Sequence, residues 1–487
     1  MISDRTISPQ IENIHSNENL AVSKFIRFLK HIGLKEMLAQ IPDHRQGIKK
    51  VYSNDSLLLW ALSVFFFRQE SKNSLNTTIL DLPTYKQNSL LNYLGVQECS
   101  LPKRDCVDDY LSSIDSEIIN GLLMQIFHWA KHNKIFYNHA ESLLPNNFFH
   151  LGIDGFWVHR YLKPHAVNKC GENICPYCLP RVHNKGKADE WTDWLHAFVT
   201  FVLIFPGGFQ FPIYVYPLKA SQVDTTASDE KLKQECELLG AYKVLPELRK
   251  KLGRIAITVL LDSLYANEPM LMLLESLNLD FLVVRQDETF KSIGQKCNEL
   301  DTSELYQKHY QDQEKRDLDG DKIMERRVKW YNNVACGKES FVNVLRFSEV
   351  TKNANGVVIK EFQTEWLSKT TINKRNWRSL MERGRMRSDH EDTHNSLKNR
   401  GFAAKHDYAR TNPNLCLNWK LLMFVAMLIF ELFSFTTIGK EAKGKRSWMK
   451  FARDLLQQLV EVAWEVISHS SILQKPKIQF RYDFAPQ

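Results

Sequence analysis

The spacing of apolar and polar residues changes several times along the chain and divides it into segments. Residues 1–19 are polar with charges of both signs and predict a flexible tail. Over residues 20–140 apolar residues recur at helical spacing, as in AVSKFIRFLKHIG and SLLLWALSVFFF, which predicts a small all-helical domain. No specific chemistry is visible in it. Because compact helical modules beside a basic core often grip DNA, we expect this domain to bind DNA.

A different pattern begins near Phe148. Three apolar segments rich in β-branched and aromatic residues, FHLGIDGFWVHR, WLHAFVTFVLIF and FQFPIYVYPL, predict three strands, with a tight turn at Pro206–Gly208. A helix rich in Lys, Glu and Leu follows, then the buried strand IAITVLLD, a helix at EPMLMLLESL and the buried strand DFLVVR. The order β-β-β-α-β-α-β predicts an α/β fold, a mixed sheet with flanking helices. It is the strand order of the ribonuclease-H-like fold.

The remaining segments complete the expected domain plan. After the first sheet segment, residues 148–290, a β-rich insertion is expected over 290–370, with strands at RRVKWYNNV, VNVLRFSEV and VVIKEFQTEWL. A basic helical segment, 371–440, follows as the last part of the sheet domain. Residues 441–487 form a C-terminal helical tail, amphipathic over Ser447–Ser468, that could serve dimerisation.

Neither a membrane span nor a secretory leader is predicted. The most apolar stretch, Leu421–Phe435, has ten uninterrupted apolar residues before Glu431, well short of the roughly 20 that cross a bilayer. It predicts a buried helix. The polar N-terminus lacks the apolar core of a signal peptide. Nine cysteines in 487 residues are not a disulfide framework, so a reducing, cytoplasmic setting is expected.

Composition excludes wholesale disorder, because 44% of residues are hydrophobic and 25% are charged. The net charge of +8 is unevenly spread: Lys369–Arg410 holds eleven basic and five acidic residues. This concentration predicts a polyanionic partner, although a solvated helix face is the alternative. The candidate DNA-binding residues in it are Arg383, Arg385, Arg387, Lys398 and Arg400.

Two aspartates stand in segments that should be buried. Asp154 lies within the first predicted strand, and Asp262 directly follows the apolar run AITVLL. An acidic residue in a buried run must be neutralised, paired or bound to metal. If the two strands are neighbours, the carboxylates can share a divalent cation, and hard oxygen ligands suit Mg²⁺ or Mn²⁺. A strand-end or capping role is the alternative for either residue alone.

A third acid occurs in RMRSDHEDTHNSLKNR. Arg387 and Glu391 are four residues apart, and Lys398 follows Glu391 by seven, so all three project from one side of a helix. The same spacing would also be found on an exposed helix surface where these charges only form salt bridges. The sharper interpretation is a metal-ligating acid flanked by two cations that contact phosphates.

The spacing R-x3-E-x6-K resembles the latter part of the Y-x2-R-x3-E-x6-K signature of bacterial DDE transposases of the insertion-sequence-four superfamily. The tyrosine position is Gly384 here, which departs from the pattern. The sequences LGIDGFWVHR and LLDSLYANEPMLMLLESLNLDFLVV around the two aspartates, together with ICPYCLPRVH and KQECEL, also resemble that family. The resemblance spans about residues 148–435. It implies a catalytic core in two parts, 148–290 and 371–440, separated by the β-rich insertion.

The resemblance also implies a mechanism and partners. Asp154, Asp262 and Glu391 would hold two divalent ions, Mg²⁺ or Mn²⁺, for in-line attack on a phosphodiester. Arg387 and Lys398 would hold phosphates of double-stranded DNA, and a homodimer would grip two transposon ends. Related enzymes hold a flipped base with aromatic residues. Trp330 and Trp366 on the inserted strands could stack that base, and core packing is the alternative for each.

A cysteine cluster predicts a second metal. The residues of C-x4-C-x2-C-x4-H lie in the loop 160–190, and thiolates and imidazole at these spacings fit a tetrahedral structural Zn²⁺ site. His165 is an alternative fourth ligand, and three free thiols are the alternative to a site. The four expected ligands are Cys170, Cys175, Cys178 and His183. His159 could face the carboxylates, but a structural role is the preferred interpretation.

Three functions remain open at this point. The first is an active transposase that cleaves and joins DNA. The second is a catalytically silent DNA-binding or scaffold protein derived from one, and the third is a nuclease of the same fold. The presence of all three acids favours an enzyme, because a DNA-binding scaffold has no physical need for them.

Overall fold

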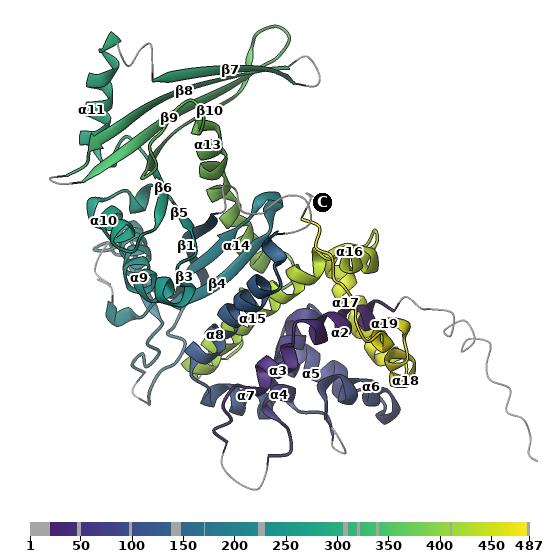
Figure 1. Cartoon of the computed structure of the whole chain (residues 1–487). Helices are drawn as coiled ribbons and strands as arrows, with labels where there is room; N and C mark the ends of the chain where they lie inside the picture. Colours follow the sequence, from purple (N-terminus) through teal and green to yellow (C-terminus); the bar gives the residue numbers. More distant parts are fainter. Residues whose placement is uncertain are drawn as a thin grey trace, which may run out of the picture.

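The computed structural model describes most of the chain, and its elements can be followed in Figure 1. The described residues are 20–45, 50–96, 100–137, 148–169, 171–222, 229–304, 310–318, 322–337, 340–409 and 412–484. The predicted tail 1–19 lies outside them. The described residues form a mixed α/β molecule: ten strands of this part of the chain make one sheet, helices flank it, and a helical body lies beside it (Figure 1).

The strand β1 organises the first part of the sheet. It pairs antiparallel with β3 and parallel with β5, and β5 pairs parallel with β6. β4 and the short β2 both pair antiparallel with β3. These strands are β1 (Phe149–Tyr161), β2 (Leu179–His183), β3 (Trp191–Ile204), β4 (Gln210–Pro217), β5 (Ile257–Leu261) and β6 (Asp280–Arg285).

The burial of these strands follows from their sequence. ITVLL of β5 is buried at every position, as expected of a parallel strand covered on both faces. The predicted order β-β-β-α-β-α-β is confirmed, with α9 (Asp229–Leu252) and α10 (Glu268–Ser276) as its helices, and β2 is an added short strand. The predicted turn is a 3₁₀ turn at Pro206–Gly208, and Phe205 donates its N–H to the Phe209 carbonyl at 3.0 Å.

The predicted β-rich insertion continues this sheet. After helix α11 (Lys291–Asp301) the chain forms β7, β8, β9 and β10, and β10 pairs antiparallel with β6. We call these four strands the β wing, since they project from the rest of the molecule (Figure 1). The polar sequence QDQEKRDL gave no signal for β7. The wing strands are β7 (Gln311–Leu318), β8 (Lys322–Ala335), β9 (Phe341–Lys352) and β10 (Val358–Ser368).

Helices from both ends of the chain form the helical body, in which the N-terminal helices lie beside the C-terminal ones (Figure 1). Phe25 packs against Phe66 and Phe433, and Phe433 packs against Phe451, so aromatic rings join the two ends. The N-terminal helices are α2 (Ala21–His31), α3 (Leu34–Ala39), α4 (Asn54–Phe66), α5 (Lys72–Leu80), α6 (Thr84–Leu94), α7 (Arg104–Ser113) and α8 (Ser116–His132). The C-terminal helices are α16 (Thr437–Lys443), α17 (Trp448–Glu461), α18 (Trp464–Ser468) and α19 (Ser471–Gln474).

Helix α15 (Pro413–Ser434) joins the helical body to the sheet, since it packs on α4, α7, α8 and β4. By length and composition α15 could cross a membrane, but 94% of its most apolar window is buried within the protein. Its polar side chains have partners: Asn418 donates to the Leu111 carbonyl at 2.7 Å, and Lys420 donates to the Ala404 carbonyl at 2.6 Å. α15 is therefore a core helix, as the sequence predicts.

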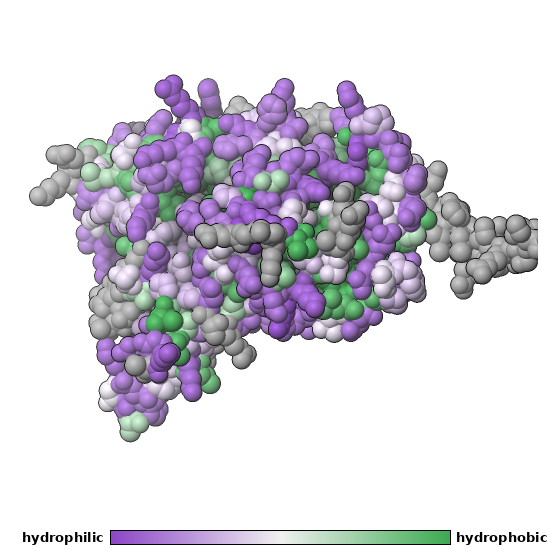
Figure 2. Space-filling model, turned by 90° about the horizontal axis from the view of Figure 1, so that it is seen from below, coloured by the Kyte–Doolittle hydropathy of each residue, from purple (hydrophilic) through white to green (hydrophobic). Residues whose placement is uncertain are grey.

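The molecule seen from below has a mainly hydrophilic surface, with hydrophobic residues in small, separate patches (Figure 2). Such scattered patches are usual on a protein surface and do not mark a large apolar interface on this side. The amphipathic faces of the C-terminal helices are used within the chain, because α17 and α19 pack on α2.

The substitution Phe451→Ala tests the packing between the two ends of the chain. Phe451 is fully buried, so its removal should lower the free energy of unfolding by about 3–5 kcal/mol. Met449 lies in the same helix and is 37% exposed, so Met449→Ala should cost less than about 1 kcal/mol. Denaturant unfolding followed by circular dichroism measures both. Equal losses would contradict the packing of α17 described above.

Candidate active site

Two parallel strands bring Asp154 and Asp262 together. Gly152 of β1 pairs with Leu260 of β5, and each aspartate follows its paired residue by two positions at the same edge of the sheet. Carboxylate oxygens of Asp154, Asp262 and Glu237 all lie within 4.8 Å of one another. The structure thus places the two predicted aspartates side by side, in a group that could hold a metal ion.

Backbone hydrogen bonds orient both aspartates. Asp154 Oδ1 accepts the N–H of Gly155 at 2.8 Å, and Asp262 Oδ1 accepts the N–H of Leu264 at 3.0 Å. The second bond caps the short 3₁₀ helix η5 (Ser263–Tyr265). Asp154 and Asp262 expose 18% and 29% of their side chains, so water and small ligands can reach them.

Glu237, the third carboxylate of this group, was not predicted as a site residue. It lies on α9 and is only 2% exposed. Its carboxylate sits against Gly155, where an added Cβ would collide with it, so glycine beside Asp154 makes room for this acid. Glu237 shares the buried face of α9 with Ala241, Val244 and Leu248. A charge on that apolar stripe is the sequence signal that could have revealed it.

Tyr265 lies fully buried beside the three acids. Burial raises its pKa well above the ordinary value, and the charges of Glu237, Asp262 and Asp154 raise it further. The phenol is therefore neutral at any physiological pH. It has no hydrogen-bond partner among the residues that the structure describes, so it presents a neutral buried donor next to the carboxylates.

Helix α14 (His390–Asn399) is held against the sheet by a buried polar cluster. Thr200 Oγ1 on β3 lies 3.0 Å from Nε2 of both His390 and His394, and it donates to the Asp154 carbonyl at 3.2 Å. Burial, with Arg387 nearby, lowers the pKa of His390 to about 3, so this ring is neutral. The approach needs glycine at position 152, because an added Cβ would lie 2.5 Å from His390 Nδ1.

The backbone of Glu391 lies in α14, but its side chain is outside the part of the chain that the structure describes. Helical spacing puts its position on the same face as His394 and Lys398, three and seven residues later. His394 Nδ1 is 3.9 Å from Asp154 Oδ2, and Lys398 Nζ lies 5.3 Å from the centroid of the Phe156 ring. That face of α14 therefore lies along β1 beside Asp154.

Arg387 lies just before α14, in the short 3₁₀ helix η6 (Met386–Asp389). Its Nη2 is 3.2 Å from Asp262 Oδ2. Both cations of the R-x3-E-x6-K spacing thus lie close to the carboxylate group, Arg387 against Asp262 and Lys398 along β1.

Two other arginines of the basic segment have structural partners instead of an open surface. Arg383 is 5% exposed and its Nη1 lies 3.9 Å from Asp280 Oδ2, and burial lowers its pKa. Arg385 pairs with Glu349 at 3.0 Å and packs over the rings of Phe347 and Phe362. Arg383 is buried and therefore does not fit the predicted DNA contact. The guanidinium of Arg385 is mainly engaged in its ion pair with Glu349. Arg400 is exposed.

The tryptophans predicted to stack a flipped base do not fit that role in this structure. Trp330 and Trp366 are each 2% exposed and pack in one apolar cluster with Leu260, Leu282 and Trp377. A base cannot reach them without unpacking that cluster, so core packing, the alternative, accounts for both.

Trp366 also explains why position 384 is glycine. A Cβ added to Gly384 would lie 2.5 Å from Trp366 Cε2, so the indole fills the space that a side chain at this position needs. A tyrosine side chain therefore has no room at this position. The side chain of His159 lies outside the described residues.

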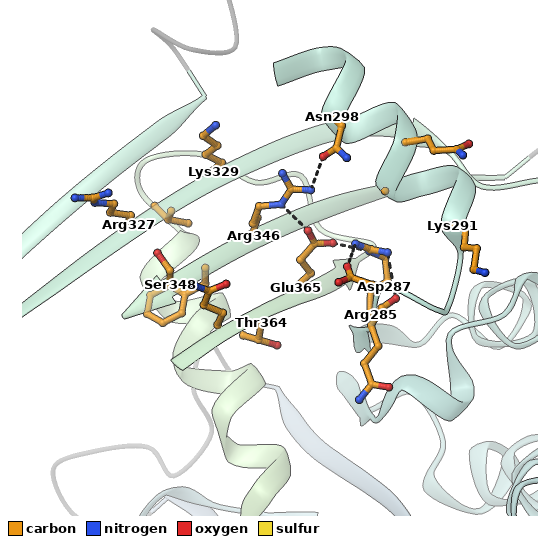
Figure 3. Close-up of a pocket in the computed structure, with 16 residues that line it drawn as sticks. Arg285, Asp287, Lys291, Asn298, Arg327, Lys329, Arg346, Ser348, Thr364 and Glu365 are labelled. Atoms are coloured by element: carbon orange, nitrogen blue, oxygen red, sulfur yellow. Dashed lines mark hydrogen bonds and ion pairs between the residues drawn. The ribbon is translucent and has the colours of Figure 1, made fainter. Parts of the chain in front are cut away.

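A large open hollow lies between the end of β6, α11 and strands β8 to β10 of the β wing, and Asp154, Glu237 and Asp262 are not among its lining residues (Figure 3). Arg285 and Arg346 both pair with Glu365, and Arg346 also reaches Asp301 at 3.1 Å. Lys291 and Arg327 are exposed at its border. The hollow is more basic than acidic; its basic lining residues are Arg285, Lys291, Arg327, Lys329 and Arg346, and its acidic ones are Asp287 and Glu365.

Of the predicted zinc ligands, Cys175 and Cys178 lie close together, whereas His183 does not join them. Cys175 and Cys178 are buried beside His196, and His165, the alternative ligand, joins that group. His183 points elsewhere: its Nε2 is 3.1 Å from Asp193 Oδ1, and its ring stacks on Trp191. Cys170 lies outside the described residues.

In comparisons with known proteins, no protein-family model and no curated protein sequence matches the chain.

The close approach of α14 to β1 predicts opposite effects of the same substitution at two glycines. Gly152→Ala should lower the free energy of unfolding by about 1–3 kcal/mol, because His390 Nδ1 and Ile204 Cδ1 lie within 2.7 Å of the new Cβ. Gly121 lies in helix α8 with no atom within 4 Å of an added Cβ. Gly121→Ala should raise stability by about 0.5–1 kcal/mol through helix propensity. Thermal unfolding of the two variants checks this, and a neutral Gly152→Ala would contradict the packing of α14.

Proposed function

We propose that this protein is a DDE transposase that cuts transposon ends and joins them to target DNA by metal-dependent phosphodiester hydrolysis and transesterification. The observation that carries the proposal is the convergence of Asp154 and Asp262 from neighbouring parallel strands, with Glu391 on the helix packed along β1. The order β4-β3-β1-β5-β6, in which β1, β5 and β6 are parallel, supports a ribonuclease-H-like core. The R-x3-E-x6-K resemblance supports the reaction.

The charge balance of the group supports divalent cations. Three carboxylates within 4.8 Å of one another repel, and the guanidinium of Arg387 offsets only one negative charge. Asp154, Asp262 and Glu391 would hold Mg²⁺ or Mn²⁺, for which hard oxygen donors are suited. When bound, such ions supply an activated oxygen nucleophile and stabilise the leaving oxygen. Glu237 adds a fourth carboxylate, either as a further ligand or as an acceptor for metal-bound water.

The other residues of the site would orient the reactants. Arg387 and Lys398 flank the acids and would hold phosphate oxygens at the transposon end. Thr200, His390 and His394 fix α14 against the sheet, so the position of Glu391 relative to Asp154 depends on them. Tyr265 stays neutral and can donate a hydrogen bond within the group.

Double-stranded DNA is the proposed partner, gripped at two transposon ends by a homodimer in the bacterial cytoplasm. At the C-terminal end of α14, Arg400 is exposed and Lys398 is partly exposed. The hollow of the β wing offers a second basic surface, of which Lys291 and Arg327 face solvent. Contacts of this kind hold the phosphate backbone and position the protein without reading bases.

A cleavage and strand-transfer assay tests the reaction. The full chain would be incubated with Mg²⁺ or Mn²⁺ and DNA carrying the sequences that flank its gene. We expect cleaved ends and joined products with the wild-type protein. Asp154→Asn, Asp262→Asn and Glu391→Gln should each lower the rate by more than about 100-fold, since outer-shell changes alone cost 10–100-fold. The control Glu382→Gln alters an exposed acid of α13 (Trp377–Arg385) and should keep activity.

The same assay separates the alternatives. Cleavage without joining would replace the transposase by a nuclease of the same fold. Binding without cleavage would replace it by a catalytically silent DNA-binding or scaffold protein. Full activity in Asp154→Asn would overturn the assignment of the carboxylates.

Charge reversal in the hollow beside the β wing tests the role of this surface in DNA binding. The double variant Lys291→Glu, Arg327→Glu should bind DNA at least about 10-fold more weakly, and the slope of log affinity against log salt should fall by roughly 2. The matched control Lys445→Glu, Lys450→Glu changes the net charge equally at exposed positions of the helical body. Fluorescence anisotropy over a salt series measures both. An equal loss in the two variants would show that only the overall charge matters.

A further inference from the structure

A second group of metal-ligand side chains lies where the loop after β1 meets β3. His165, Cys175, Cys178 and His196 are 6%, 2%, 0% and 4% exposed, so all four are buried together. Ligand atoms of His165, Cys175 and His196 lie within 4.8 Å of one another. His196 Nε2 is 3.4 Å from Cys175 Sγ and 3.3 Å from Cys178 Sγ. We call these four residues the thiol–imidazole cluster.

The distances fit a shared tetrahedral ion. With Zn–S near 2.3 Å and Zn–N near 2.0–2.1 Å, sulfur and nitrogen ligands of one tetrahedral zinc are about 3.6 Å apart. The two S···N distances in the protein are within about 0.3 Å of this expected separation between ligand atoms. Two thiols packed against one imidazole nitrogen would otherwise make only weak hydrogen bonds, because S–H is a poor donor and sulfur a poor acceptor.

The backbone around the cysteines is arranged as it is at a metal knuckle. Cys175-Pro176-Tyr177-Cys178 forms a turn in which the N–H of Cys178 donates to the Cys175 carbonyl at 3.3 Å. The N–H of His165 donates to Cys178 Sγ at 3.2 Å. A backbone donor aimed at sulfur stabilises a thiolate, which is the form that binds metal.

The two nitrogens of His165 have different surroundings. Nε2 faces the Ala409 carbonyl and lies 3.6 Å from Asp407 Oδ1. Nδ1 is buried without a hydrogen-bond partner among the described residues. A metal-ligating histidine commonly donates one N–H to a carbonyl or carboxylate and binds the ion with its other nitrogen. His165 has this arrangement, with Nδ1 as the atom left for the metal.

We propose that His165, Cys175, Cys178 and His196 bind one structural Zn²⁺ ion. Both thiols lose a proton on binding, and both imidazoles bind in the neutral form. His196 replaces His183 in the predicted ligand set, because His183 is engaged with Asp193 and Trp191. Cys416 on α15 is buried beside both imidazoles, His165 and His196, but it is left out because only Cys175 and Cys178 share the backbone turn and the His165 N–H that orient the thiols.

The ion would fasten a segment that has little core of its own. Among the described residues, only Ala166 is buried in one apolar group with Cys175 and Cys178, and the partly buried Tyr177 and, from β3, Trp194 pack against it. Zinc would tie the loop to β3 through His196. Through His165 and its contacts to Asp407 and Ala409 it would also tie the loop to the segment that precedes α15. A closed four-ligand site contributes folding energy directly.

Metal analysis of the purified full chain tests this inference. After dialysis against a weak chelator, the wild-type protein should retain about one zinc per chain, measured by mass spectrometry of the metal. Cys175→Ser and His196→Gln should each retain less than about a tenth of that amount. Two matched controls, His183→Gln and Cys297→Ser, alter a nearby histidine and a buried cysteine outside the cluster, and both should keep the metal.

Cobalt substitution supplies a measurement that does not depend on whether the variants fold. Co²⁺ in the wild-type chain should show thiolate-to-metal charge-transfer bands and the intense visible absorption of a tetrahedral site. Asp154→Asn with Asp262→Asn should keep both zinc and this spectrum, which separates the cluster from the proposed catalytic site. Wild-type protein without zinc, a cobalt spectrum without thiolate bands, or loss of zinc in His183→Gln would overturn the proposed ligand set.

Discussion

Repulsion between carboxylates is the constraint on which the site depends. The parallel pairing of β1 with β5 delivers Asp154 and Asp262 to one edge of the sheet, and α9 adds Glu237 from its buried face. Fixed carboxylates this close repel one another, and the guanidinium of Arg387 offsets one negative charge. Glycine at 155 leaves room for the third carboxylate, and the proposed divalent cations would offset the remaining negative charge at that edge.

The helix that carries Glu391 reaches this edge through small residues and buried hydrogen bonds. Gly152 allows the approach of His390, and Thr200 touches both histidines of α14. Polar clusters of this kind fix geometry more sharply than apolar packing, because each buried group is costly if its partner moves. His196 of the thiol–imidazole cluster pairs with His159 of β1, so the proposed metal ion would brace the same strand on the other side of Asp154.

The parts of the site visible in the sequence are those that break a local pattern. Asp154 and Asp262 stand out because each is a charge in an apolar run, and the strand order followed from the same runs. Glu237 breaks the apolar stripe of α9 in the same way, but the helix is rich in Lys and Glu and hides the signal. Arg383 and Arg385 belong to a basic run, and nothing local distinguishes an arginine that faces Asp280 from one that faces DNA.

The thiol–imidazole cluster was harder to predict, because its members are remote in the chain. His196 sits inside the apolar strand WLHAF, and only its pairing register with β1 and β2 places it beside the cysteines. Position 384 must be glycine for a similar reason, because Trp366, eighteen residues earlier, fills the space that a side chain there would need.

Manganese binding measures the central claim most directly. Mn²⁺ titrated into the full chain and followed by electron paramagnetic resonance should show saturable binding. That binding should be lost when Asp154 and Asp262 are both changed to Asn and kept when Glu382 is changed to Gln. Mn²⁺ binding that is absent from the wild-type protein, or unchanged in the double variant, would contradict the account.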